Sequence, residues 1–247
     1  MVCCLALLFT HSSGAQTNHA NTLPLDELIK QEEAVRLARK AIVDAERTHG
    51  VNHIKVADQL DKMAQVYEKQ RKYAAAEPFY KRALKIREAS LGENHLAVAA
   101  TLNNLGDLYL EEEKYAAAEP LFKRALAIEE SAYGANSAKL VAPLVRLAEL
   151  QGSQRQFAAA IQLQQRALAI REKELGPSHR ELDGSLMHLA YLHQKLGQYA
   201  ETETLLKRAL AIREKTSGAE SSAVKIALFN LALAYQAQDR AADAEPL

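Results

Sequence analysis

The segment KYAAAEPLFKRALAI, from Lys114 to Ile128, recurs along the chain with its small, aromatic and basic residues in the same positions. Similar segments begin at Lys72, Gln156 and Gln198, each a multiple of 42 residues away, and Arg240 begins a fifth copy. Self-similarity at such a period is typical of proteins built from stacked supersecondary units, which bury their apolar faces against one another. The sequence therefore predicts a repeat protein with one continuous domain.

Glycines divide the chain at the same 42-residue spacing, at Gly50, Gly92, Gly134, Gly176 and Gly218. A glycine just past a helix adopts the left-handed C′ conformation without Cβ strain, so we expect each to end a helix. A His or Ser follows each glycine three residues later, and an Asn or Ser follows the first four of them two residues later. Asn and Ser at such places accept hydrogen bonds from the free N–H groups of the next helix. Each loop is thus predicted to contain a helix end followed by a helix start.

One repeat is predicted to be a helix of about 17 residues, a tight turn and a second helix of about 18 residues. In residues 96–134 the first helix offers small Gly106 beside Tyr109, and the second offers small Ala118 beside Phe122. Small residues let two helix backbones approach, while the aromatic rings fill the space beside them. The expected ranges are an N-terminal helix at 24–48, repeats at about 54–92, 96–134, 138–176 and 180–218, and a truncated repeat at 221–247.

Two places depart from this pattern. The third repeat has Gln151 and Gln164 at the aromatic positions, and Pro143 falls inside its first helix. Proline removes a helical hydrogen bond and clashes with the preceding turn, so we expect a bend or a late helix start there. In the last repeat we expect an apolar face to be half covered, which predicts a self-association edge or a longer parent protein. The residues of that face are Leu228, Leu231 and Tyr235.

The small and aromatic positions resemble the tetratricopeptide repeat. The 42-residue period, with NNLGDLY from Asn103 and EPLFKRALAIEE from Glu119, resembles the longer variety found in kinesin light chains and many bacterial proteins. The resemblance covers residues 31–247. It implies an all-α, right-handed superhelical solenoid of about eleven helices. It also implies that the chain holds other proteins, often an extended peptide in the concave groove.

On each predicted first helix, the positions one residue past the core leucines form a separate stripe. The resemblance places this stripe in the groove. Asparagine offers both a donor and an acceptor to a peptide backbone, and the stripe changes from acidic at the N-terminal end to apolar near Phe229. The candidate peptide-binding residues are Asn103, Asn104, Asp107, Arg146, Met187, Tyr191, Phe229 and Asn230. The charged residues of the KRALAIRE-type segments are instead expected on the convex surface, where they form local pairs four residues apart.

Composition argues against several classes of partner. Lys plus Arg equals Asp plus Glu at 31 each, so the chain lacks the basic field that nucleic acid or an anionic membrane requires. The longest N-terminal apolar run is too short to span a bilayer.

The chain contains no phosphate-loop, HExxH or GxSxG motif, and its only cysteines are Cys3 and Cys4. We therefore expect no catalytic, cofactor or metal site, with His188 partly exposed and His193 in the core.

The first fifteen residues, MVCCLALLFTHSSGA, have the outline of a secretory signal peptide cleaved after Ala15. Residues 16–23 are polar and are predicted to form a disordered linker. This interpretation places the protein in the periplasm or outside the cell. The alternative is a cytoplasmic protein, because the segment lacks the usual Lys or Arg before its apolar run.

Two functions follow from these observations. The first is a non-catalytic scaffold that binds a protein or peptide partner. The second is the N-terminal sensory part of a longer effector, because similar exported arrays are fused to caspase-like protease domains in bacteria.

Overall fold

A computed structural model describes residues 24–218 and 220–245. The predicted signal peptide and linker lie outside the described residues. Within the described residues the chain forms eleven α-helices, two short 3-10 helices and no strand. The α-helices are α1 (Leu25–His49), α2 (Ile54–Lys69), α3 (Tyr73–Leu91), α4 (Leu96–Glu111), α5 (Tyr115–Tyr133), α6 (Val141–Ser153), α7 (Phe157–Leu175), α8 (Asp183–Lys195), α9 (Tyr199–Ser217), α10 (Ser222–Gln236) and α11 (Ala241–Ala244).

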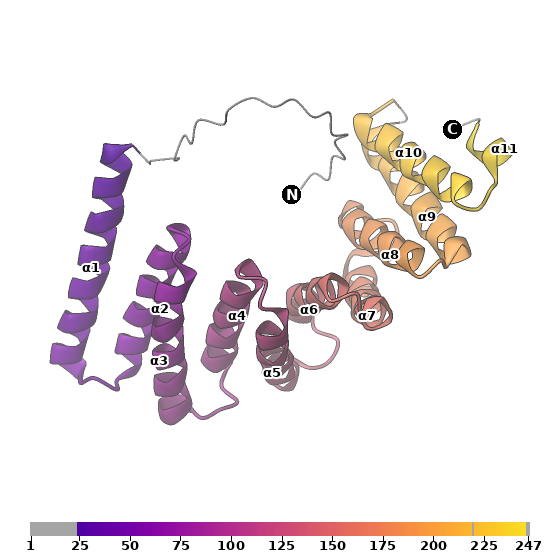
Figure 1. The fold of residues 1–247 in the computed structure, drawn as a ribbon. Helices are drawn as coiled ribbons and strands as arrows, with labels where there is room; N and C mark the ends of the chain where they lie inside the picture. The colour runs from indigo at the N-terminus through magenta and orange to yellow at the C-terminus, as the bar shows by residue number, and fades with distance from the viewer. Residues whose placement is uncertain (1–23, 219, 246–247) are drawn as a thin grey trace.

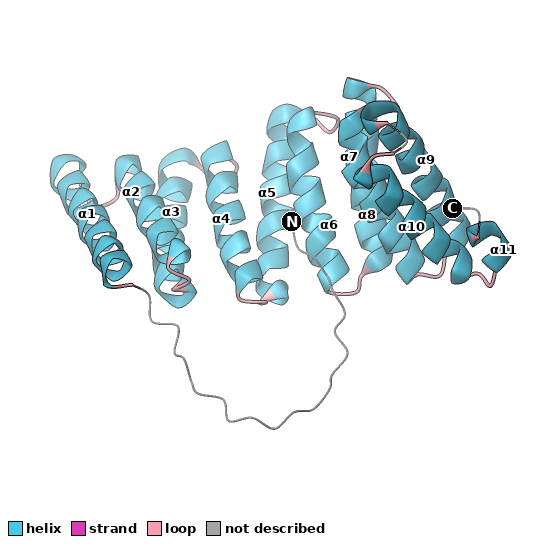
Figure 2. Ribbon diagram, turned by 90° about the horizontal axis from the view of Figure 1, so that it is seen from above, coloured by secondary structure: helices cyan, strands magenta, loops and turns pink. Residues whose placement is uncertain are grey.

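The helices stack side by side in chain order, and each packs mainly against its neighbours in sequence (Figure 2). The row curves into an arc, with α4, α6 and α8 on its inner side (Figure 1). We call the exposed faces of the first helices of the repeats, α2, α4, α6, α8 and α10, the inner surface. The predicted all-α solenoid is confirmed.

Small residues and aromatic rings pack the core as the repeat pattern predicts. Ala118 is fully buried and Phe122 is 2% exposed. A Cβ added at Gly106 would lie 2.5 Å from Cε1 of Phe122, so only glycine leaves room for the ring in its present position. The cluster around Phe122 also includes Leu140 and Leu144 of the next repeat, so the ring packs at the junction between two repeats.

The repeat-ending glycines do terminate helices, but their conformation differs from the prediction. Gly134, for example, has φ 84° and ψ 149°, and the other four have similar values. This is an extended conformation with positive φ that is nearly exclusive to glycine, and it is not the left-handed helical region. The helix that follows is capped by His53, His95 or His179 in three loops, where the ring Nδ1 accepts a backbone N–H. The predicted Asn and Ser caps are therefore replaced by histidine in these loops.

The turn inside each repeat uses a motif that the sequence pattern did not reveal. Arg71, Glu113, Arg155 and Asp239 have φ between 56° and 60°, and Gly197 occupies the same place in the fourth repeat. The next residue donates its N–H to the carbonyl oxygen five positions back, as in Lys72 to Tyr67 at 2.9 Å. This is the Schellman arrangement, which normally places glycine at the left-handed position. Because four of the five residues are not glycine, composition alone gave no signal.

The late start predicted in the third repeat is confirmed. Residues Ala138–Leu140 form a 3-10 turn, and α6 begins only at Val141, two residues before Pro143. Helix α8 also starts late, after a 3-10 turn at Arg180–Leu182, although no proline lies within it. The N-terminal helix begins at Leu25, one residue later than expected, because Pro24 has an extended ψ of 142°.

Lysines of the second helices form the expected local pairs four residues apart, as in Lys81 with Glu77, but the arginines beside them connect neighbouring repeats instead. Arg82 of α3 donates to Glu46 of α1 at 2.6 Å and to the carbonyl oxygen of Val51 at 3.1 Å. Equivalent bridges join Arg124 to Glu88, Arg166 to Glu130 and Arg208 to Glu172. Each pair is separated by 36 residues in the chain, so it forms only after the repeats have stacked.

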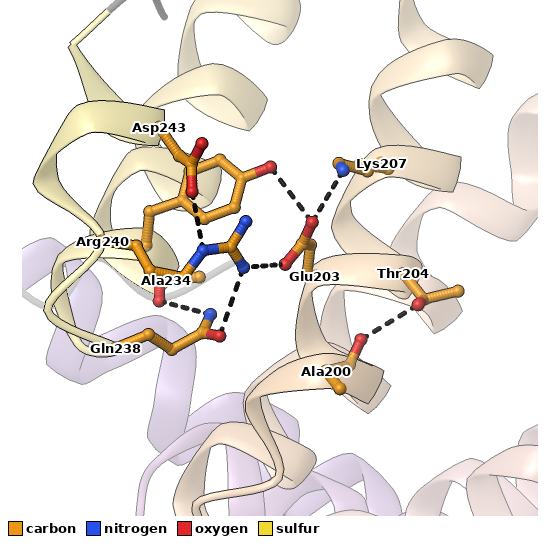
Figure 3. Close-up of polar contacts among 9 residues, drawn as sticks. Ala200, Glu203, Thr204, Lys207, Ala234, Gln238, Arg240 and Asp243 are labelled. Atoms are coloured by element: carbon orange, nitrogen blue, oxygen red, sulfur yellow. Dashed lines mark hydrogen bonds and ion pairs between the residues drawn. The ribbon is translucent and has the colours of Figure 1, made fainter.

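Tyrosine–glutamate pairs also link neighbouring repeats. The hydroxyl of Tyr109 donates to Glu77 at 2.9 Å, and that of Tyr235 donates to Glu203 at 3.2 Å. Glu203 also accepts from Arg240 at 2.6 Å and from Lys207 at 2.7 Å (Figure 3). Together these hydrogen bonds lower the pKa of Glu203 to about 2, and the one from Lys207 makes the largest contribution. The carboxylate therefore stays ionised and holds α9, α10 and the start of α11 together.

The third repeat lacks this link. Gln151 occupies the position of Tyr109, and its Oε1 atom is buried without a hydrogen-bond partner among the described residues. Glu119, equivalent to Glu77, is already paired with Lys123. We expect Gln151→Tyr to raise the free energy of unfolding by about 1 kcal/mol, because its hydroxyl can donate to Glu119. Urea denaturation measures the change. Gln151→Phe is the control, and equal gains from both variants would refute a contribution from the hydroxyl.

The face predicted to be uncovered at the C-terminal end is in fact largely covered. Leu231 and Tyr235 are 2% and 6% exposed, because they pack against Leu206 of α9 and Ala190 of α8, and Leu228 is partly buried. The exposed apolar residues of α10 are Ile226, Phe229 and Leu233 instead. They lie on the inner surface, so the uncovered patch is displaced from the predicted edge.

Candidate functional site

The N-terminal part of the inner surface is acidic. Arg87 of α3 lies beneath it and pairs with Asp58 at 2.8 Å and with Asp61 at 2.5 Å, both on α2. Arg87 also donates to the hydroxyl of Thr101 on α4. The guanidinium is buried, whereas Asp58 is largely exposed. This arginine therefore ties the first two repeats together under an acidic surface.

Three more carboxylates, those of Glu68, Asp107 and Glu111, lie in the same region as Asp61. Glu68 accepts from the hydroxyl of Tyr80 at 2.7 Å, and Glu111 accepts from the hydroxyl of Tyr73 at 3.2 Å. Burial raises the pKa of Glu68, and the nearby carboxylates of Asp107, Glu111 and Asp61 raise it further. The carboxyl groups thus repel one another across α2 and α4, and a cation placed among them would be stabilised.

The predicted polar residues of α4 and α6 are partly engaged within the protein. Asn103 donates to Glu129 of α5 at 3.1 Å. Asp107 pairs with Arg146 of α6 at 3.0 Å, and Arg146 also lies over the ring of Phe122. These contacts position the side chains along the inner surface. They also give Asn103 a structural partner that the stripe pattern did not predict. Asn104 is half-buried on the same helix.

The C-terminal part of the inner surface is apolar, and it brings three predicted residues together around one cavity. Met187 and Tyr191 of α8 and Asn230 of α10 line a cavity of about 220 Å³, closed below by Thr202 and Leu206 of α9. Pockets for drug-sized ligands measure about 300–1,000 Å³, so this cavity suits a single side chain. Phe229 lies on the same helix as Asn230 and is 63% exposed.

Ile226 and Leu233 belong to the same patch but are absent from the predicted set. They are 56% and 40% exposed, and they lie three residues before and four residues after Phe229. That spacing places all three on one face of α10. The helical period could have identified Ile226 before the structure was known.

Other kinds of site find no support in the described residues. Within 24–218 and 220–245, no group of three or more His, Cys, Asp or Glu residues is arranged to hold a metal ion. None of the described helices is both long and apolar enough to cross a membrane. His193 is buried and its Nδ1 lies 2.7 Å from Oε1 of Gln198, while His188 is partly buried, as predicted.

Comparison with known proteins identifies the same repeat. The tetratricopeptide repeat profile matches residues 30–89, 58–131, 98–173 and 181–247. A search of curated proteins finds no match.

Solved structures share the fold. A putative kinesin light chain with nearly identical TPR-like repeats from Podosopora anserina is 24% identical, with a TM-score of 0.68 over 78% of this chain and 92% of that one. BtubC (BKLC) from P. vanneervenii is 21% identical, with a TM-score of 0.67 over 87% of each chain. Since the profile matches most of its length, the chain belongs to the tetratricopeptide-repeat family, in the form resembling kinesin light chains.

Proposed function

We propose that this protein is a binding scaffold that holds an extended segment of a partner protein along its inner surface. Tetratricopeptide repeats bind protein partners, which supports a scaffold in general terms. The observation that carries the specific proposal is the exposed apolar patch beside a cavity of one side chain's size. Exposed aromatic residues around such a cavity are the usual anchors of a protein interface.

The partner-binding residues in this proposal differ in their roles. Met187, Tyr191 and Phe229 form the apolar contact, and Asn230 on the cavity wall is available to a peptide backbone. Asn104, Asp107 and Arg146 offer polar contacts farther along. Asn103 has a structural role in this proposal, because it donates a hydrogen bond to Glu129.

A random peptide display library tests the proposal directly. Peptides enriched on the full chain should bind the Tyr191→Ala/Phe229→Ala variant at least about tenfold more weakly, a loss of about 1.4 kcal/mol. Fluorescence anisotropy measures the affinity. Because both side chains are at least 49% exposed, the melting temperature should change little.

The matched control is Leu37→Ala/Val43→Ala on α1. These side chains are apolar and 53% and 54% exposed, but they lie outside the inner surface. The control should keep its affinity within about twofold. Equal losses in the two variants, or no enriched peptide at all, would refute the proposed function.

A further inference from the structure

The two ends of the inner surface have opposite chemistry. The acidic end consists of Asp58, Asp61, Glu68, Asp107 and Glu111 on α2 and α4. The apolar end consists of Met187, Tyr191, Ile226, Phe229 and Leu233 on α8 and α10. Between them α6 presents Ala142, Val145 and Glu149, a largely neutral surface.

The acidic end is not neutralised by the protein itself. Arg87 is shared between Asp58 and Asp61, and Arg146 pairs with Asp107. Glu68 and Glu111 are held by tyrosine hydroxyls, and neither forms an ion pair among the described residues. Lys62 and Lys69 are exposed on α2 and are further cations in this region, so five carboxylates still outnumber four cations. A partner that binds here gains from bringing positive charge.

Resting on the proposed binding function, we propose that the partner is an extended segment with two basic residues at one end and two bulky apolar residues at the other. The basic residues contact Glu68 and Glu111. One apolar side chain enters the cavity beside Tyr191, and the other covers Phe229.

The number of repeats between the two ends sets an approximate spacing. The acidic and apolar ends are three repeats apart, about 30 Å if successive first helices lie roughly 10 Å apart. An extended chain advances about 3.3 Å per residue, so about nine residues separate the basic and apolar contacts. The helices do not determine the direction of the segment, so both orders of the probe are needed.

The probe is a fluorescent synthetic peptide with Arg-Arg, a Ser/Asn/Thr spacer of about nine residues, and Phe-Leu, made in both orders. We expect one order to bind, and replacing Arg-Arg by Glu-Glu should weaken binding about tenfold at low salt. Replacing Phe-Leu by Ala-Ala should weaken it to a similar degree. Raising the salt concentration should remove the Arg-Arg advantage while leaving the Phe-Leu advantage.

Variants of the protein identify the contact. Glu68→Gln/Glu111→Gln should abolish the preference for Arg-Arg over Glu-Glu, because glutamine keeps the tyrosine hydrogen bonds without the charge. Glu174→Gln/Glu214→Gln, exposed on α7 and α9, changes net charge equally and should keep the preference.

The outcomes separate this inference from the proposed function. If library-selected peptides bind through Tyr191 and Phe229 but the Arg-Arg probe is no better than its Glu-Glu version, the scaffold stands and this inference is wrong. A preference that survives Glu68→Gln/Glu111→Gln also overturns it. If no peptide depends on the inner surface, both fail.

Discussion

Replacing Phe122 by alanine should lower the free energy of unfolding by about 3–5 kcal/mol, the usual cost of deleting a buried aromatic ring. Phe122 is 2% exposed and packs against Leu140 and Leu144 of the next repeat, so the cavity opens at a junction between repeats. Because stability in an array depends on interfaces between neighbours, the loss should also weaken their coupling. Urea denaturation measures the first effect, and amide hydrogen exchange in α4–α6 measures the second.

A second substitution tests whether the space is shared with Gly106. A Cβ at Gly106 would lie 2.5 Å from the ring, so Gly106→Leu should destabilise the protein on its own. In the double variant Gly106→Leu/Phe122→Ala, the new side chain fills the cavity, and we expect the two losses to be far from additive. Additive losses would mean that the two sites do not share one packing space.

This pair of residues could be predicted from the sequence, because small and aromatic positions recur with the period. The linking arginines could not, since Arg82 and Glu46 are separated by 36 residues and meet only when the repeats stack. The left-handed residues Arg71, Glu113 and Arg155 were also beyond prediction, because hydrogen bonding by the turn, not residue type, holds them there.

The candidate site was predictable to a similar extent. The change from acidic to apolar residues follows from reading one helical face across the repeats. The engagement of Asn103 does not, because it depends on Glu129, which stands where three other repeats have Arg87, Arg171 and Arg213. A single exception in the second helix thus alters the role of a residue on the first.

Removing Arg87 should lower the free energy of unfolding as much as removing Phe122 does, but for an electrostatic reason. Arg87→Met leaves Asp61, whose side chain is 13% exposed, without its cation. Breaking a buried ion pair by deleting one partner costs about 3–5 kcal/mol, because the remaining charge stays desolvated. Urea denaturation at neutral pH measures this loss. Arg87→Met/Asp61→Asn should recover most of it, since no uncompensated charge is then left in that place.

The pH dependence separates charge from packing. Burial already raises the pKa of Asp61 and Arg87 opposes that shift, so the pKa should rise further in Arg87→Met. A carboxyl group with a raised pKa in the folded state binds its proton more tightly when folded. That extra stability is fully present below the unfolded pKa of about 3.9 and is lost as the pH rises through the folded pKa. The deficit of Arg87→Met should shrink as the pH is lowered from neutral toward about 4, whereas that of Arg87→Met/Asp61→Asn should not. A deficit that is independent of pH in both variants would mean that Arg87 stabilises the first two repeats through packing and its contact with Thr101, not through its charge.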